Sequence, residues 1–365
     1  MKTVLNAYNP IHGRKLPRPP RRCTKRLMSN NFKLHIYYDF KDGPWGGGNQ
    51  FLKALRGALR EQDSYAETMD DADAVLFNSH HFGEYDQGLQ ALHLFKRHNP
   101  TLPILHRIDG PVRLIRGLGR LTDHTVFKAN ALYADGTLFQ TEWSKARSLA
   151  HGYKPCPPVT TIINSVDPEI FYADEARKPG KKLKLIATSW AANKRKGFDI
   201  YEYFDEHLDF DRFEMTFVGN LPRPFKNIEH IEPQSSHDLA EILRAHDIYV
   251  TASRNDPCSN ALCEGLACGL PALALNSGGH PEIVRQGGVL FEGEDDVLSA
   301  LDELALHYAD YKNDIALPHI NDTAVSYINF AKACYETLLS YPRPILNSAP
   351  KAMQRQLIRT RTVER

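Results

Sequence analysis

The sequence predicts an α/β protein made of two parallel-sheet domains. Short apolar runs alternate with segments of helical periodicity along most of the chain. A length of 365 residues is enough for two domains of ordinary size. The alternation is interrupted between about 155 and 180, where "KPCPP" and "ARKPGKK" occur. Strand–helix alternation on both sides of this break indicates parallel sheets with helices on both faces.

The first domain begins with a buried strand and a glycine loop. The loop leads into a segment with helical periodicity, and strands and helices then alternate as far as the break. In chain order the expected elements are "FKLHIYYDF" (strand), "NQFLKALRGALREQ" (helix), "ADAVLFNSHH" (strand), "GLQALHLFKRHN" (helix), "LPILHRIDG" (strand and its exit loop), and then "YADGTLFQT" and "VTTIINSVD".

The second domain repeats the alternation. In chain order its first elements are "KLKLIATSW", "GFDIYEYFDEHL", "FEMTFVGN", "HDLAEILRAHD" and "IYVTAS". Ligands of such sheets bind beyond the carboxyl ends of the strands, where the loops converge. We therefore search for functional residues in the loops that leave the strands.

Composition excludes several classes of function. Lys plus Arg (45) and Asp plus Glu (44) nearly cancel, which argues against nucleic acid as a partner. No apolar run is long enough to span a membrane, and "MKTVLNAYNP" lacks the apolar core of a signal peptide. The six cysteines form no Cys-x-x-Cys pair, so we expect small buried thiols and no zinc site. This cysteine usage indicates a cytoplasmic protein.

Both ends of the chain are basic. Residues 1–30 contain "GRKLPRPPRRCTKR" and predict a flexible arm, and residues 342–365 contain "KAMQRQLIRTRTVER" and predict a basic tail. Two interpretations stay open: solvated tails, or peripheral contact with an anionic membrane.

The segment "RNDPCSNALCEGLACGLPALALNSGGHPEIV" carries two carboxylates eight positions apart. Asp256 is a good N-cap and Pro257 suits the first helical position, so we expect a helix through Cys268 that stops at Gly269. Such a helix would separate Asp256 from Glu264 by roughly 12 Å along its axis. That distance suits one extended ligand contacted at two points, and does not suit a metal.

A glycine turn follows after the short strand "LPALAL". "NSGGHPEI" predicts a turn that opens a helix at Pro281, and such a turn offers backbone N–H groups to an anion. Glu282 is expected to support the first helical turn.

The order and spacing of this segment resemble the donor-site signature of retaining glycosyltransferases of family 4, which have the GT-B fold. Asp256 stands where the family has a glutamate. "IINSVDPEIF", "SWAANKRKGFDI" and "PWGGGNQF" resemble the family's interdomain linker, strand-exit loop and N-terminal glycine loop. The resemblance is strong over about 160–330, weaker over 32–155 and absent from both tails.

The resemblance implies two Rossmann-like domains that face each other across a cleft. The expected division is 1–30 basic arm, 31–160 acceptor domain, 161–325 nucleotide-sugar donor domain, 326–341 C-terminal helix that packs back on the N-terminal domain, and 342–365 basic tail.

The resemblance also places donor-binding residues. Glu264 would hold the ribose hydroxyls, Asp256 the sugar hydroxyls and Lys196 the diphosphate. Trp190 stands where the family has an arginine, so Lys194 or Arg195 would supply the second cation. The remaining expected contacts are backbone groups of Ser277, Gly278 and Gly279, and of Gly46, Gly47 and Gly48, where the absence of side chains allows close approach.

On the acceptor side, the family often places a histidine at a strand end near the transferred sugar. His106 matches that position and Asp109 lies close by, so both are predicted to be catalytic, together with Asp256. A structural role for His106 stays open, and His80 and His81 are further candidates. Arg113, Arg116 and Arg120 would share one helical face, either solvated or in contact with an acceptor phosphate. Asp71 and Asp73 resemble a metal-binding Asp-x-Asp, but they precede a strand, which indicates a turn.

The implied function is transfer of a hexose-type sugar from a UDP- or GDP-sugar to an acceptor hydroxyl, with retention of anomeric configuration. The acceptor would be a glycan, glycolipid or glycoprotein, in glycan or cell-surface polysaccharide synthesis, and neither a metal nor a cofactor would be required. Two alternatives stay open: a nucleotide-sugar-binding protein that has lost turnover, and a nucleotide-sugar epimerase.

Overall fold

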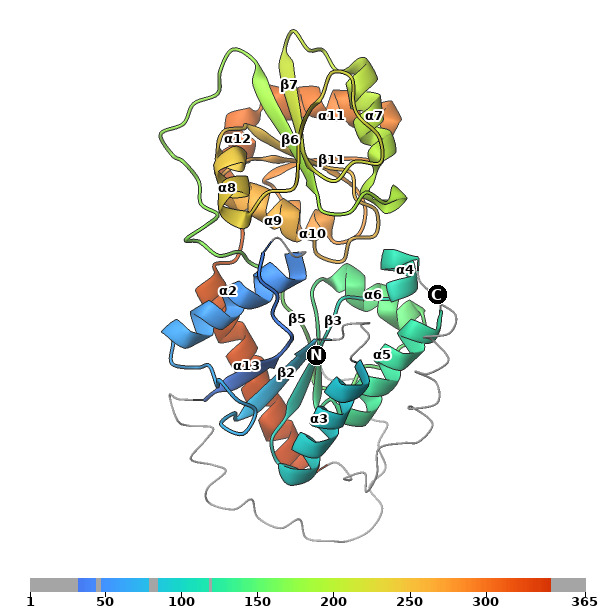
Figure 1. Ribbon diagram of the computed structural model, residues 1–365, viewed down its shortest axis with the longest axis vertical. Helices are drawn as coiled ribbons and strands as arrows, with labels where there is room; N and C mark the ends of the chain where they lie inside the picture. Colours follow the sequence, from blue (N-terminus) through green and yellow to red (C-terminus); the bar gives the residue numbers. More distant parts are fainter. Residues whose placement is uncertain (1–31, 44–46, 79–84, 118–119, 343–365) are drawn as a thin grey trace, which may run out of the picture.

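The computed structural model describes residues 32–43, 47–78, 85–117 and 120–342. The predicted basic arm, the tail beyond Pro342, Gly46, His80 and His81 lie outside these residues. The chain forms two lobes, each built on a parallel sheet, and the lobes meet end to end (Figure 1). The predicted two-domain α/β fold is confirmed. Of the helices described, none is both long and apolar enough to cross a membrane.

The N-terminal lobe contains a five-stranded sheet in the order β1-β2-β3-β4-β5, and each neighbouring pair is parallel. Its strands are β1 (Leu34–Tyr37), β2 (Ala74–Asn78), β3 (Ile104–Ile108), β4 (Gly136–Phe139) and β5 (Val159–Thr161). Its helices are α2 (Gly47–Glu61), α3 (Tyr85–His98), α4 (Val112–Arg116), α5 (Arg120–Tyr133) and α6 (Glu142–Ala150).

A single parallel bridge at the edge of this sheet explains how helices cover both of its faces. Tyr65 pairs with Leu34 on the side of β1 that is opposite to β2. The chain therefore leaves β1 through α2, touches the outer edge at Tyr65 and returns to β2 on the inner side. Right-handed crossovers then place α2 on one face and α3 and α5 on the other, as Figure 1 shows. The winding reverses between β1 and β2.

The C-terminal lobe contains a six-stranded parallel sheet in the order β11-β10-β9-β6-β7-β8. Its strands are β6 (Leu183–Ser189), β7 (Phe213–Gly219), β8 (Glu229–Ile231), β9 (Ile248–Thr251), β10 (Ala272–Leu275) and β11 (Gly288–Phe291). The winding reverses between β6 and β9, so the loops that leave these two strands diverge and open a crevice. The short helical elements are η1 (Lys194–Lys196), α7 (Phe198–His207), α8 (Ser236–Arg244), α9 (Asn260–Ala267), α10 (His280–Val284), α11 (Glu294–Leu306) and α12 (Tyr308–Asn313).

Helix α13 (Ile320–Ser340) leaves the C-terminal lobe and lies along the N-terminal lobe (Figure 1). It begins at Ile320 rather than at 326. Its buried side chains belong to the core of the N-terminal sheet, where Tyr327 contacts Phe51 and Tyr335 contacts Phe32, each pair with ring centroids 6.2 Å apart.

The helix that carries Glu264 starts later than predicted. α9 begins at Asn260, and its N-cap is Ser259, whose hydroxyl accepts a hydrogen bond from the Leu262 N–H at 3.3 Å. Pro257 disfavours helical backbone at Asp256, and Asn255 has a φ of 55°. Asp256 therefore lies in the loop before the helix, and the separation estimated along one continuous helix does not apply.

The predicted arginine face is also wrong. α4 ends at Gly117, whose φ of 75° is left-handed, and Arg120 starts a separate helix, α5. Arg113 and Arg116 are consequently on one short helix and Arg120 is on another. Two glycines so close together favour a break over a continuous helix.

Candidate functional site

The carboxyl ends of the two sheets face each other, and side chains bridge the lobes there. The hydroxyl of Thr141, after β4, donates to the carbonyl of Pro257, after β9, at 2.7 Å. The amide of Asn164, in the segment that links the lobes, donates to the Asn260 side-chain oxygen at 2.9 Å. The loops expected to hold ligands therefore meet at the junction of the lobes.

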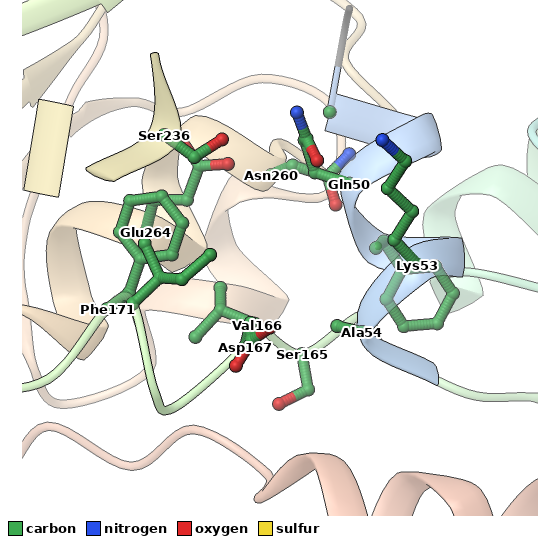
Figure 2. Close-up of a pocket in the computed structure, with 13 residues that line it drawn as sticks. Gln50, Lys53, Ala54, Ser165, Val166, Asp167, Phe171, Ser236, Asn260 and Glu264 are labelled. Carbon is green, nitrogen blue, oxygen red and sulfur yellow. The ribbon is translucent and has the colours of Figure 1, made fainter. Parts of the chain in front are cut away.

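A pocket opens at this junction between α2, the linking segment and α9 (Figure 2). The first turn of α2 contributes Gly47 and Gln50, residues 165–171 form another wall, and Ser236 and Glu264 close the C-terminal side. A Cβ atom on Gly47 would lie 2.6 Å from the Asn260 side-chain nitrogen, so only glycine lets α2 begin against α9. Gly48 has open space around it and needs no glycine for packing.

Glu264 has the electrostatic character of a ligand-binding group. Its half-buried side chain lies beside Ser236 in the pocket (Figure 2). Burial raises the pKa of Glu264 to about 8, because apolar surroundings disfavour the charged form. Within the described part of the chain, its carboxyl group has no hydrogen-bonding or ion-pairing partner. A buried carboxyl without a partner is costly, and hydroxyl groups of a ligand would relieve that cost.

Lys196 and Asp256 meet in the crevice between β6 and β9. The Lys196 Nζ lies 3.3 Å from an Asp256 carboxylate oxygen, and both side chains are partly exposed. Lys196 ends η1, and the turn closes at Gly197, which has a φ of 74° and whose added Cβ would lie 2.5 Å from the Cβ of Ala252. The winding reversal of the sheet thus brings Lys196 and Asp256 together. The family resemblance assigns Lys196 to the diphosphate of a donor and Asp256 to its sugar.

The other two expected cations behave differently from each other. The Arg195 guanidinium donates to the backbone carbonyl of Leu114 in α4, so it joins the two lobes. Lys194 is exposed at the start of η1. Trp190, at the end of β6, is 49% exposed. The geometry leaves Lys194, and not Arg195, free to act as a second cation beside Lys196.

The expectation for the glycine turn is wrong in part. The Ser277 N–H donates to Leu275 at 2.7 Å and the Gly279 N–H donates to Asp256 at 2.8 Å, so neither group is free for an anion. Gly278 has a φ of 68°, and an added Cβ would lie 2.7 Å from the Asp256 nitrogen. The turn therefore holds the loop that carries Asp256, because its own N–H groups find partners inside the fold.

His106 lies in the core and not in the cleft. It sits in the middle of β3, is 1% exposed, and stacks on Phe77 with ring centroids 4.7 Å apart. Its Nδ1 lies 3.2 Å from the amide nitrogen of Asn130. Burial lowers the pKa of His106 to about 3, so the ring is neutral. The prediction of a catalytic His106 is therefore wrong, because β3 continues to Ile108 and the histidine does not reach the strand end.

Arg107 and Asp109 occupy the strand end instead. Arg107 is 1% exposed, which is unusual for a charged residue, while the Asp109 side chain is 33% exposed at the edge of the cleft. Their charged groups form an ion pair at 3.2 Å. Arg107 was not among the predicted site residues, although a charged residue inside the apolar run "PILHRI" was a usable signal.

Asp71 and Asp73 form the predicted turn. Asp71 bonds to the Thr68 hydroxyl at 2.7 Å and Asp73 accepts from the Lys33 backbone N–H at 3.0 Å, before β2 begins. They lie at the amino end of the sheet, away from the cleft. Over the described ranges, no group of three or more His, Cys, Asp and Glu side chains is arranged to hold a metal ion.

Comparison with known proteins identifies the C-terminal lobe. Residues 189–307 match the family model "Glycosyl transferases group 1". These residues form a glycosyltransferase group 1 domain. This domain includes η1, the crevice with Lys196 and Asp256, the helix of Glu264 and the glycine turn.

Solved structures similar to the whole chain have the GT-B fold of two facing parallel-sheet domains. One is Anabaena Alr3699/HepE in complex with UDP and glucose, which has a TM-score of 0.58 and 12% sequence identity and matches 85% of this chain and 99% of its own. The glycosyltransferase group 1 domain thus forms the C-terminal half of a GT-B fold.

Similarity to curated proteins is more local. The chain is 27% identical over 164 residues to an uncharacterized protein 356 of Sulfolobus islandicus rod-shaped virus 1, covering 40% of this chain and 46% of the relative. It is 36% identical over 81 residues to a D-inositol 3-phosphate glycosyltransferase of Stackebrandtia nassauensis, covering 21% and 18%. The match to each of these relatives spans less than half of the relative's length.

Proposed function

We propose that this chain is a glycosyltransferase that moves a sugar from a nucleotide-sugar donor to an acceptor hydroxyl in the cleft between its lobes. One observation carries the proposal. The Lys196–Asp256 pair and the carboxyl of Glu264, which has no hydrogen-bonding partner among the described residues, follow β6 and β9 at the carboxyl edge of the glycosyltransferase group 1 domain. A carboxyl group for hydroxyls and a cation for phosphate suit the two ends of a nucleoside diphosphate.

The donor occupies the C-terminal lobe in this proposal. The ribose hydroxyls bind Glu264, the diphosphate lies at Lys196 with Lys194 nearby, and the sugar hydroxyls lie at Asp256. Gly47 and Gly48 at the start of α2 allow the opposite wall to approach the donor. Residues 161–325 thus form the donor domain, and residues 31–160 form the acceptor domain.

The proposed reaction transfers a hexose-type sugar with retention, as in family 4. The acceptor oxygen forms a bond to the anomeric carbon on the face that the leaving group vacates. The bond from that carbon to the phosphate oxygen breaks, its electron pair stays on the diphosphate, and the acceptor proton passes to the departing phosphate. Lys196 stabilises the charge that grows on the diphosphate, so the proposal includes no metal ion.

The proposed donor is a UDP- or GDP-sugar, and the proposed acceptor is a hydroxyl of a glycan, glycolipid or glycoprotein. The Alr3699/HepE structure, which contains UDP and glucose, supports a UDP-sugar donor. The relative named D-inositol 3-phosphate glycosyltransferase supports an acceptor that carries hydroxyl groups. We further propose that the enzyme acts in the cytoplasm and takes part in polysaccharide synthesis. The proposal holds with or without membrane contact through the basic ends of the chain.

A thermal-shift screen of UDP-, GDP- and ADP-sugars tests the proposal. Binding to the folded state alone raises the free energy of unfolding by about 2.7 kcal/mol at a hundredfold excess over Kd, and the unfolding temperature rises with it. We expect one nucleotide class to stabilise the wild type and to release its diphosphate when a mixture of saccharide acceptors is added. Glu264→Ala should bind the same donor at least about tenfold more weakly. No shift with any donor, or equal affinity in the variant, would contradict the proposal.

A further inference from the structure

The carboxylate of Asp109 is fixed on one side and open on the other. Its Oδ1 accepts hydrogen bonds from the Arg107 guanidinium at 3.2 Å and from the side-chain amide of Gln140. Its Oδ2 has no hydrogen-bond partner among the residues that the structure describes. Asp109 stands at the carboxyl end of β3, where the lobes face each other. An anchored carboxylate with one unused oxygen at a cleft is suited to accept a hydrogen bond from a ligand hydroxyl.

Arg107 is the centre of the group that fixes this carboxylate. Its Nη1 donates to Asn78 at 2.9 Å as well as to Asp109, and its Nη2 donates to Asn164 at 2.8 Å. Its guanidinium carbon lies 5.0 Å from the ring centroid of Phe51. The planar guanidinium is thus held in one orientation by groups on β2, on the linking segment and on α2.

The same group reaches the donor side of the cleft. Asn164 is fully buried and donates to Gln140 at 3.0 Å and to Asn260 at 2.9 Å. Asn260 begins α9, and Glu264 lies one turn later on the same face of that helix. Asp109 is therefore linked through Gln140 and Asn164 to the helix that carries the carboxyl group proposed to hold the donor ribose.

We propose that Asp109 binds a hydroxyl group of the acceptor through Oδ2, and that Arg107 is a positioning residue that holds Asp109 for this task. The inference rests on the proposed function and adds the acceptor contact to it. The acceptor is a polyol, such as a saccharide, since a carboxylate that accepts through one free oxygen recognises a hydroxyl donor. Gln140 is a second positioning residue because it donates to the same oxygen as Arg107.

A purely structural role would not require Arg107 to be charged. Removing a charge from water is costly, and an apolar side chain of similar length among Phe51 and its neighbours would fill the space without that cost. The guanidinium provides what an apolar side chain cannot: donors held in one plane, one of which fixes the orientation of the Asp109 carboxylate.

The test measures nucleoside diphosphate release from the donor selected by the thermal-shift screen, with methyl glycosides as acceptors. The variants are Asp109→Asn, Arg107→Met and the double variant, with Arg212→Met as a matched control. Arg212 forms an exposed ion pair with Asp302 just before β7, at the amino edge of the C-terminal sheet. Donor affinity is measured in parallel by calorimetry.

We expect Asp109→Asn and Arg107→Met each to lower kcat/KM for the acceptor by about tenfold or more, with donor Kd changed less than about twofold. If Arg107 acts through Asp109, the double variant should be no more than about threefold slower than Asp109→Asn alone. The control should retain wild-type kinetics. Should Arg107→Met fail to fold, Gln140→Leu replaces it, with a smaller loss that again disappears in the Asp109→Asn background.

Three results would overturn the inference while leaving the proposed function intact. These are wild-type kinetics in the Asp109→Asn or Arg107→Met variant, losses that multiply fully in the double variant, and losses that appear equally in donor affinity. A wild-type protein that neither binds nor turns over any donor would instead overturn the proposed function, and this inference with it.

Discussion

Glu282 of the C-terminal lobe caps the helix of the N-terminal lobe that begins at Glu142. Its two carboxylate oxygens accept hydrogen bonds from the backbone N–H groups of Glu142 and Trp143, both at 2.7 Å. From the sequence, Glu282 was predicted to support its own helix. It lies instead at the positive end of α6, next to the Thr141 contact with Pro257.

This relationship predicts that Glu282 favours the closed arrangement of the lobes. Replacing it with Gln removes the charge and one acceptor, at a cost of about 1 kcal/mol. We expect a larger radius of gyration by X-ray scattering and a donor Kd weakened about fivefold. Glu214→Gln is the matched control, because Glu214 is exposed on β7 and lies 3.7 Å from Lys184. Identical scattering and affinity in Glu282→Gln and wild type would refute the role.

The raised pKa of Glu264 predicts a pH-dependent stability. The folded protein keeps this carboxyl protonated between its ordinary pKa of 4.5 and about 8, whereas the unfolded chain ionises. The contribution of this group to the free energy of unfolding is complete below pH 4.5 and is lost as the pH rises through the folded-state pKa of about 8. In the wild type, the free energy of unfolding should fall by on the order of 2 kcal/mol between about pH 5 and pH 8.5 through this group. Glu264→Gln should remove this fall. Thermal melts of both proteins across that range provide the measurement, and parallel curves would argue against it.

The Lys196–Asp256 pair predicts separate effects on two ligands. Lys196→Ala removes the cation assigned to the diphosphate, so affinity for the free nucleoside diphosphate and for the nucleotide sugar should both fall about tenfold or more. Asp256→Asn keeps the shape of the side chain and should weaken only the nucleotide sugar. Calorimetric titrations with both ligands distinguish the roles. Equal losses for both ligands in Asp256→Asn would show that Asp256 acts only by holding Lys196.

Two glycines in different backbone settings should respond oppositely to alanine. Gly278 has a φ of 68°, and its added Cβ would lie 2.7 Å from the Asp256 nitrogen. Gly278→Ala should therefore lower the free energy of unfolding by about 2 kcal/mol or more and displace the Asp256 loop. Gly57 lies inside α2 with no atom within 4 Å of its added Cβ, so Gly57→Ala should raise stability by up to about 1 kcal/mol. Denaturant unfolding measures both, and a tolerated Gly278→Ala would contradict the packing argument.

The repeating pattern of the chain was predictable because it is local. Apolar runs such as "LPALAL" have too few residues for a helix, and each became a strand between helical segments. Turn glycines were also predictable, since Gly269 and Gly197 adopt left-handed backbone that other residues avoid.

The site was less predictable because it depends on distant partners. The local pattern predicted a helix start at Asp256, whereas the helix is capped by Ser259, and this difference depends on Asn255 and the loop around it. The same limitation applied to β3, which ends at Ile108, two residues beyond His106, and so leaves His106 inside the core and Asp109 at the edge. Arg107 donates to Asn164 and Glu282 accepts from Trp143. Both partners are remote in the chain, so the neighbouring sequence does not reveal these contacts.

The position of α13 has a consequence for the order in which the protein folds during synthesis. The five strands of the N-terminal sheet leave the ribosome first, yet Tyr327 and Tyr335 complete the core beneath Phe51 and Phe32. The complete C-terminal sheet is translated between these two events. A nascent N-terminal lobe must therefore keep part of its apolar surface uncovered until α13 emerges, so this lobe finishes folding only after the C-terminal sheet has been translated.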